Sequence, residues 1–242
     1  MTTVTKIIVS VVLAMLVLSC NFNVNFGPGV SGNGNVVTDQ RHLNDHFNRI
    51  EVSRGLDVYL TQSDNESIEV RADENLQEII ITEVKNNVLE IYADKNIRSS
   101  KSKKVFVNFK TLSSISSSSG SDVYSTNTIT AGDLDLSTSS GSGMELNLEA
   151  ESVNCDSSSG SNLKLSGKTN KLYATASSGS DIKAGNFNAM SSHVKASSGA
   201  DITVNTSKEL IAKASSGGDI KYYGNPEKVH TSGGVSGSIR KE

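Results

Sequence analysis

The chain of 242 residues contains no tryptophan and only 5% aromatic residues, which leaves few large side chains for a conventional globular core. Its formal net charge of −3 argues against a nucleic-acid-binding protein with a broad basic surface. Only two cysteines occur, Cys20 and Cys155, so no disulfide framework is expected in the folded part of the chain.

The first twenty residues have the pattern of an export signal. Lys6 precedes an apolar run from Ile7 to Leu18, which is too short to span a membrane and typical of a signal-peptide core. The run closes on Leu16-Val17-Leu18-Ser19-Cys20, which resembles a bacterial lipobox. We interpret residues 1–20 as a lipoprotein signal peptide and Cys20 as the lipid attachment site, with an ordinary secretory signal as the alternative.

An Asn- and Gly-rich segment follows at residues 21–35 and predicts a flexible tether. We place the folded domain at residues 36–242, with an irregular first half at 36–112. In that half, apolar and polar residues alternate as in half-buried strands at 56–60, 68–72, 88–92 and 105–109.

Three connecting segments of the first half carry further predictions. Asn86-Asn87 lies between two alternating runs and predicts a turn. Residues 73–79 fit one short helix with Asp73 as its cap, followed by a strand from Ile79. The basic segment 97–104 is interpreted as a solvated loop rather than as a contact for an anionic polymer.

A repeated phrase organises residues 113–242: two serines, a glycine, a small residue, a polar residue and an aliphatic residue. Its glycines are Gly120, Gly141, Gly160, Gly179, Gly199 and Gly217, and a degraded seventh copy is Ser232-Gly233-Gly234-Val235. The spacings of 21, 19, 19, 20, 18 and 16 residues are typical of stacked coils. We therefore predict an all-β fold, a right-handed parallel β-helix (solenoid) with coils of about 20 residues. A flexible Ser/Gly linker is the alternative, but a linker needs no aliphatic residue at a fixed distance from each glycine.

Every second residue of a repeat is predicted to face a narrow interior. In one copy these residues are Val153, Cys155, Ser157, Ser159, Ser161, Leu163 and Leu165. Glycine is expected at the bends, and stacked serines are expected to hydrogen-bond along the axis. Cys155 in this column is predicted to be a small buried hydrophobe and not a nucleophile.

Aspartates recur at one offset after the glycines, as Asp122, Asp181, Asp201 and Asp219, with Asn162 in one coil. Stacked carboxylates of this kind can bind calcium. However, this repeat is about twice as long as the nine-residue calcium-binding repeat and offers too few oxygens per turn. We interpret these side chains as solvated surface charges, with Lys183 and Lys221 nearby as counter-charges.

Other chemistry finds little support in the sequence. His42 and His46 have the i, i+4 spacing of a metal pair on a helix, but the intervening Asn44 and Asp45 favour a loop. We find no paired-carboxylate or cationic cluster typical of glycosidases and lyases, and no phosphate-binding loop. We therefore predict no catalytic residue, no metal site and no cofactor, and we leave the ligand-binding residues open.

Two stretches carry a family resemblance. Residues 47–60, preceded by Gly32-Asn33-Gly34-Asn35-Val36-Val37, resemble the opening of the head GIN domain family, described as autotransporter adhesins of Bacteroidetes-type bacteria. The Ser-Ser-Gly-Ser-Asp-Ile phrase and the closing residues 232–239 are also similar to that family. The resemblance covers about residues 31–242. It implies a parallel β-helix at the cell envelope and brings no catalytic residues with it.

Together these features predict a non-enzymatic lipoprotein of the outer membrane that is held by the lipid on Cys20 and binds an unidentified glycan or protein. Whether it faces the cell surface or the periplasm is left open. The alternatives are a periplasmic partner in envelope structure or maintenance and, less favoured, a carbohydrate-active β-helix enzyme. Exposed coil ends also favour homo-oligomers.

Overall fold

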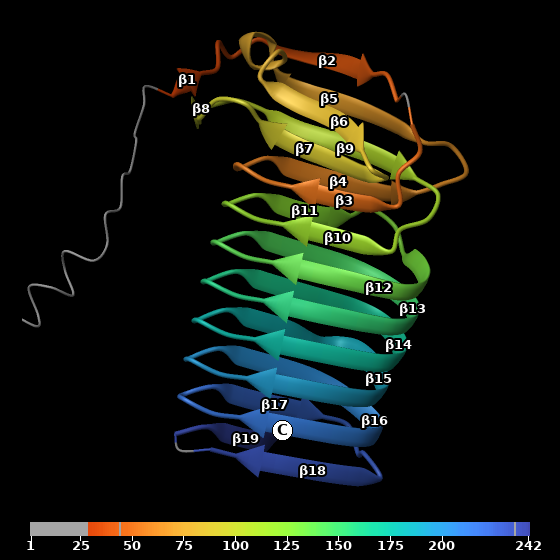
Figure 1. Cartoon of the computed structure of the whole chain (residues 1–242), viewed down its shortest axis with the longest axis vertical. Coiled ribbons are helices and arrows are strands. Elements are labelled where there is room, and N and C mark those ends of the chain that lie inside the picture. The colour runs from red at the N-terminus through yellow and green to blue at the C-terminus, as the bar shows by residue number, and fades with distance from the viewer. Residues whose placement is uncertain (1–28, 44, 235) are drawn as a thin grey trace, which may run out of the picture.

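A computed structural model describes residues 29–43, 45–234 and 236–242; the predicted signal peptide, Cys20 and residues 21–28 of the expected tether lie outside them. Within this range the chain winds into a stack of two-sided coils, as Figure 1 shows. No helix in this part of the chain has the length and apolar character needed to cross a membrane. The predicted all-β parallel solenoid is confirmed.

Two sheets form the opposite sides of the stack. The first sheet contains, in spatial order, β2 (Val36–Arg41), β5 (Ser67–Asp73), β9 (Lys103–Phe109), β4 (Asp57–Gln62), β11 (Asp122–Ser125), the first halves of β13 (Gly143–Ser157), β14 (Asn162–Ala176), β15 (Asp181–Ala196) and β16 (Asp201–Ala214), then β17 (Asp219–Tyr223) and β19 (Ser238–Lys241). The second sheet contains β6 (Ile80–Lys85), β7 (Val88–Ala93), β3 (Arg49–Val52), β10 (Ser114–Ser117), β12 (Ile129–Thr138), the second halves of β13 to β16, and β18 (Lys228–Gly233).

Consecutive coils pair in parallel and almost in register, so equivalent residues of the repeat lie one above another. Asn162 of β14 pairs with Gly143 and with Asp181, which gives coils of 19 residues here. Each long strand from β13 to β16 bends once and contributes to both sheets. Outward-facing side chains therefore form columns that run along the solenoid.

Each serine–glycine phrase forms a tight turn at one edge of the stack. In the turn Ser158–Ser161, the N–H of Ser161 donates to the carbonyl of Ser158 (3.3 Å), and Ser159 and Gly160 have φ of 56° and 69°. These dihedral angles are typical of a type I′ turn. The N–H of Gly160 donates to the carbonyl of Ser178 in the next coil (3.1 Å), so the turns stack on one another.

Because of the turn geometry, part of the prediction of which serines are buried is wrong. Ser159 is exposed, and so are its equivalents Ser178, Ser198 and Ser216, although the period-two pattern placed them inside. Two successive residues with positive φ break the strand alternation, so the inward direction resumes only at the fourth turn residue. Ser161, at that position, is buried as predicted.

At both ends of the solenoid, the repeated turn lies at other positions than the glycine spacing predicted. The N–H of Gly217 donates to the carbonyl of Ser236 (2.8 Å), and Asp219 pairs with Ser238. The seventh turn therefore includes Ser236, with φ of 65°, and the predicted copy at 232–235 is wrong. Arg54 and Gly55, with φ of 62° and 79°, form an additional copy, because β4 after them stacks on β11.

Inside the turn edge, hydroxyl groups hydrogen-bond between coils. Thr138 Oγ1 donates to Ser157 Oγ (3.0 Å), Ser157 Oγ lies 2.9 Å from Ser161 Oγ, and Ser161 Oγ donates to the carbonyl of Thr138 (3.0 Å). The expected serine stacking is thus confirmed in these coils. Later coils place alanine or glycine at the same sites: Ala176, Ala196, Ala200, Ala214 and Gly218.

The core is a continuous column of aliphatic side chains between the two sheets, and Phe109 and Phe187 are its largest fully buried members. Cys155 is also fully buried, and burial raises the pKa of its thiol. The thiol is therefore a packing group, as predicted.

The N-terminal end is built from antiparallel strands. β5 is antiparallel to β9, β2 is antiparallel to β5, and β6 and β7 form a hairpin. Asn86 and Asn87 have φ of 52° and 63° in that hairpin, which confirms the predicted turn. The basic segment 97–104 contributes β8 (Ile97–Ser99) and the start of β9 and is therefore not simply a loop.

Residues 29–35 belong to the folded part, although the predicted tether extended to residue 35. β1 (Val30–Ser31) pairs with β8, and the N–H of Gly34 donates to Asp73 Oδ2 (2.9 Å). Asp73 Oδ1 also accepts from the N–H groups of Lys101 (3.0 Å) and Ser102 (2.9 Å). The carboxylate joins three segments instead of capping a helix, and only a single 3-10 turn, η1 (Glu74–Leu76), follows it.

Candidate functional site

The first sheet presents two adjacent outward columns. The first column consists of Asp57, Asp122, Gly143, Asn162, Asp181, Asp201, Asp219 and Ser238. The second consists of Phe106, Tyr59, Tyr124, Glu145, Lys164, Lys183, Thr203, Lys221 and Arg240. The sheet is therefore aromatic toward its N-terminal end, while basic side chains flank an acidic column toward its C-terminal end.

The aspartates line up as predicted, and lysines accompany them. Lys183 Nζ lies 3.5 Å from Asp181 Oδ2. Within the described ranges, no group of three or more His, Cys, Asp or Glu side chains is arranged to hold a metal ion. His46 Nδ1 instead lies 2.7 Å from Glu66 Oε2.

Asp57 and Asp122 are neighbours in the acidic column and form a carboxylate pair that sequence reasoning missed. Burial raises the pKa of Asp122, and the charge of Asp57 raises it further, against the opposing effects of Lys103 and the Gly143 N–H. The two residues lie on separate strands 65 positions apart, so only the stacking of β11 on β4 brings them together. Neither carboxylate lines the hollows described below.

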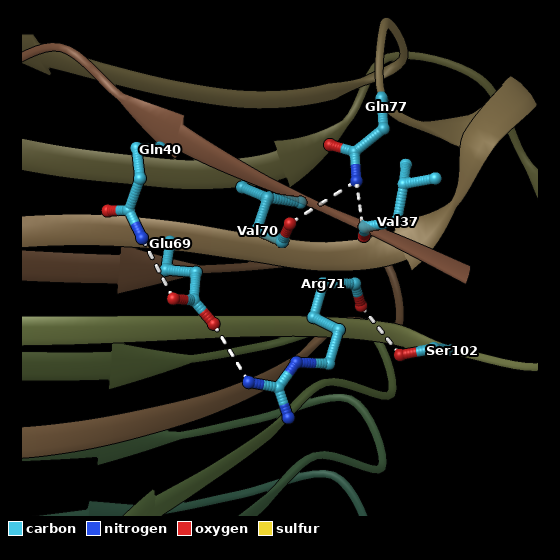
Figure 2. Close-up of polar contacts among 7 residues, drawn as sticks. All are labelled: Val37, Gln40, Glu69, Val70, Arg71, Gln77 and Ser102. Carbon is cyan, nitrogen blue, oxygen red and sulfur yellow. Dashed lines mark hydrogen bonds and ion pairs between the residues drawn. The ribbon is translucent and has the colours of Figure 1, made fainter.

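Aromatic side chains stack beside this pair. The ring centroids of Phe106 and Tyr59 are 5.0 Å apart, and those of Tyr59 and Tyr124 are 5.3 Å apart. The Arg71 guanidinium lies 4.8 Å from the Phe106 centroid. Figure 2 shows how Arg71 is held: its guanidinium donates to Glu69 (2.9 Å), which also accepts from Gln40 (2.8 Å). We call Phe106, Tyr59 and Tyr124 the aromatic ladder. Because their rings cover one another, the aromatic ladder mainly stabilises the sheet.

A hollow lies in the same sheet over β14 to β17. We call it the Tyr223 hollow; its volume is about 540 Å³, and its lining consists of Lys164, Leu165, Lys183, Gly185, Asn186, Thr203, Asn205 and Tyr223. The Tyr223 side chain is an exposed aromatic group, with 42% of the residue's surface accessible. Its ring lies beside Gly185, where an added Cβ would be 3.5 Å from it. The glycine therefore leaves room next to the ring.

A change of register produces this hollow. Ala184 pairs with Val204 and Asn188 pairs with Asn205, so residues 185–187 of β15 have no pairing partners in β16. The extra residues bulge out of the ladder, as insertions in paired strands do. The sequence contains a sign of this bulge, because the repeat glycines are 20 residues apart at this coil and 18 residues apart at the next. Nothing in the spacing indicated that the bulge would border an exposed tyrosine.

A second hollow of about 610 Å³ lies at the bend where the strands pass from one sheet to the other, and it meets the Tyr223 hollow at Asn205. Its lining includes Thr130, Ala150, Asn170 and Asn188. Asn205 Nδ2 donates to Asn188 Oδ1 at 2.8 Å. The two hollows together offer amide, hydroxyl and carboxylate groups, ammonium donors and one aromatic ring. This set suits a polyhydroxylated ligand, whose hydroxyls need both donors and acceptors.

Comparison with known proteins places this geometry in a family. Residues 46–226 match the family described as "Putative auto-transporter adhesin, head GIN domain". The chain belongs to this family. The match covers the additional copy of the turn at Gly55 and all the regular coils up to the end of β17.

Solved structures of similar proteins have the same fold. A protein described as a putative adhesin from Bacteroides fragilis is 25% identical, with a TM-score of 0.82 over 88% of this chain and 100% of its own. A putative adhesin from Parabacteroides distasonis is 24% identical, with a TM-score of 0.70 over 88% and 99%. A protein from the same species, described as a putative lipid binding protein, is 21% identical, with a TM-score of 0.65 over 88% and 99%. No functionally curated protein matches the chain.

Proposed function

We propose that this head GIN domain protein is a non-catalytic binding module of the cell envelope that holds a saccharide ligand in the Tyr223 hollow. The single observation that carries the proposal is the exposed Tyr223 ring beside Gly185, with Asn186, Asn205 and Lys183 around it. A sugar ring packs its C–H face on an aromatic ring, and amide groups bond its hydroxyls. The adhesin descriptions of the family and of the similar Bacteroides fragilis protein agree with a binding role.

The rest of the proposal concerns location. The protein is exported, acylated at Cys20 and held at the outer membrane, with the coils facing the cell surface. Replacing Cys20 by serine is expected to abolish incorporation of labelled fatty acid and to move the protein from the membrane to the soluble fraction. Protease treatment of intact cells is expected to degrade the wild-type protein; full protection would indicate a periplasmic orientation.

The binding proposal is tested with the full protein on an array of neutral and acidic polysaccharides. Tyr223→Ala is expected to weaken binding at least tenfold, which corresponds to about 1.4 kcal/mol. Tyr223→Phe keeps the ring and is expected to retain most of the affinity. Tyr173→Ala is a matched control, because Tyr173 has a similar exposure of 45% but lies on the second sheet. Saccharide binding no stronger than that of an unrelated lipoprotein, or binding unaffected by Tyr223→Ala, would overturn the proposal.

A further inference from the structure

The Tyr223 hollow continues beyond the coils that form it. The second hollow, which we call the bend hollow, shares Asn205 with it and reaches Thr130 on β12. From β12 to β17 the two hollows cross consecutive coils, which Figure 1 shows one above another. Five steps at the strand spacing of ~4.8 Å give a path of roughly 24 Å along the solenoid axis. Each hollow alone has the volume of a site for a drug-sized ligand, so the pair has room for several sugar units.

The bend hollow offers the same kinds of contact as the Tyr223 hollow. Its floor is formed by short side chains in register, which are half-buried or buried: Ala131, Ala150, Thr169 and Ala189. The exposed amides of Asn170 and Asn188 also line it. Because Asn205 Nδ2 donates to Asn188 Oδ1 (2.8 Å), the N–H groups of Asn188 remain available to a ligand. A sugar chain packs its C–H faces on apolar groups and bonds its hydroxyls to amides, so both hollows suit the same chain.

The charges around the two hollows cancel. Three lysines line the hollows, and each is held by a carboxylate: Lys164 Nζ lies 2.7 Å from Glu145 Oε1, Lys168 Nζ lies 3.1 Å from Glu149 Oε2, and Lys183 Nζ lies 3.5 Å from Asp181 Oδ2. The bend hollow also contains Glu151, which has no ion-pair partner among the described residues. Three ammonium groups therefore face four carboxylates, and an anionic ligand would gain no net attraction.

The neighbouring part of the first sheet adds no excess of positive charge. A smaller hollow beside Tyr223 has a lining with equal numbers of acidic and basic side chains: Asp181, Asp201, Asp219, Lys183, Lys221 and Arg240. Binding of an anionic polymer relies on a surface where cations outnumber anions. The hydroxyl groups of a neutral sugar need only donors and acceptors, which the amides supply. The charge balance therefore favours an uncharged ligand.

We propose that the two hollows together hold a segment of one uncharged, linear polysaccharide that lies along the solenoid axis. This inference rests on the proposed saccharide binding at Tyr223 and adds the chemical class and the direction of the ligand. The Tyr223 ring holds one sugar unit by its C–H face. The amides of Asn205, Asn188 and Asn170 bond hydroxyl groups of the units that follow. Because the contacts are spread over several coils, a polymer binds more tightly than a short fragment does.

Chain length tests the extended site. The full protein is titrated with pullulan, dextran, a linear β-1,3-glucan and a linear β-1,4-mannan, and then with the disaccharide of the polymer that binds most tightly. The disaccharide is expected to bind roughly tenfold more weakly than the polymer, because it makes fewer contacts. A disaccharide that binds as tightly as its polymer would overturn the proposal.

A substitution in the bend hollow tests the same point at one residue. Asn170→Ala is expected to weaken polymer binding roughly three- to tenfold, as the loss of a hydrogen bond does, and to leave disaccharide binding at Tyr223 unchanged. Asn154→Ala is the matched control, because Asn154 is an exposed asparagine on the second sheet, outside both hollows. Polymer binding that Asn170→Ala leaves unchanged would overturn the extended site.

Carboxymethylation of the same polymer tests the charge class. The carboxymethylated polymer is expected to bind roughly fivefold more weakly, because Glu151 repels the added carboxylates. Glu151→Gln is expected to recover part of that loss and to leave binding of the neutral polymer unchanged. Raising the NaCl concentration from about 50 to 500 mM is expected to change neutral binding by less than about twofold. Tighter binding of the carboxymethylated polymer, or of polygalacturonate, than of every neutral polymer would overturn the proposal.

The same variants separate this inference from the proposed function. If Tyr223→Ala weakens the binding of an anionic polymer, or of a disaccharide that binds as tightly as its polymer, the saccharide site at Tyr223 stands and only the neutral, extended ligand is wrong. If no saccharide binds, or Tyr223→Ala changes the binding of none of them, both proposals are wrong.

Discussion

The N-terminal end and the regular coils use the same two sheets in different ways. From β10 onward, all strand pairs are parallel and one turn is repeated, with small side chains at the turn edge. Between residues 29 and 112, only the turn at Arg54 and Gly55 continues the repeat, and three antiparallel pairings, a 3-10 turn and polar contacts such as those in Figure 2 take its place elsewhere.

This difference follows from what each region must achieve. A coil inside the stack has a neighbour on each side, so one short sequence can be repeated with little change. The first coil has a neighbour on only one side, and its open strand edges must be covered. The N-terminal region covers them with β2, β5 and β6 and holds the covering segments through side chains such as Asp73 and Gln77, which occur once. Four substitutions test this contrast.

The largest effect on stability is expected from removing a large side chain from the core of the regular coils. Phe187→Ala removes a fully buried ring and is expected to destabilise the protein by about 3–5 kcal/mol. Because coils contact only their neighbours, hydrogen exchange is expected to accelerate in β14 to β16 while β4, β5 and β9 keep their protection. Phe187→Leu is the control and is expected to cost less than about 1.5 kcal/mol. Equal loss of protection in the N-terminal strands would contradict the contrast between the two regions.

The second prediction asks whether the repeats are interchangeable. Gly218 occupies the site of Ser161 and Ser180 in earlier coils, yet a Cβ there would lie 2.5 Å from the carbonyl carbon of Ala196. Gly218→Ser restores the repeated residue and is nevertheless expected to destabilise the protein by about 1–3 kcal/mol, measured by urea denaturation. Ala200→Ser in the preceding coil, where a Cβ is already present, is expected to cost less. A neutral Gly218→Ser would show that the coils are equivalent.

The third prediction concerns only the N-terminal region. Burial raises the pKa of Asp73, but the N–H groups of Gly34, Ser102 and Lys101 and the Lys101 charge outweigh this and leave the pKa lowered. A carboxyl group whose pKa is lowered in the folded state stabilises the fold at pH values above its unfolded-state pKa of about 3.9. That contribution is lost as the pH falls through the folded-state pKa.

Slow hydrogen exchange of β1 and β8 is therefore expected to persist at pH 5–7 and to weaken below about pH 4. Asp73→Asn is expected to accelerate exchange there at neutral pH and to remove this acid dependence. The exposed Asp64→Asn serves as the control. Unchanged exchange of β1 in Asp73→Asn would show that the carboxylate does not hold the segment.

The smallest effect is expected at the aromatic ladder that joins the two regions. Tyr124 belongs to the first regular coil and stacks on Tyr59 of β4. Tyr124→Ser is expected to cost about 0.5–1.5 kcal/mol, since an aromatic cross-strand pair contributes that much. Tyr124→Phe keeps the stack and is expected to be close to neutral in the same denaturation experiment. A larger cost for Tyr124→Phe would indicate that the hydroxyl, and not the ring, matters.

The repeat in the amino-acid sequence was sufficient to predict the solenoid, the burial of Cys155 and the in-register aspartates. A period of about 20 residues, with an aliphatic residue at a constant offset, has few other physical explanations. The same pattern misplaced Ser159 and the seventh turn, because a turn with two positive φ angles is not visible in a period-two alternation.

Only the tertiary structure brought together Asp57 and Asp122, the rings of Phe106, Tyr59 and Tyr124, and the Tyr223 hollow. The sequence carries local periodicity, which fixes how each coil winds and which side of a strand is buried. Long-range strand pairing decides which coil stacks on which. This holds across the insertion of residues 61–113 and across the bulge at 185–187. Surface sites on a solenoid form between coils, so their composition is set by that pairing and not by any one repeat.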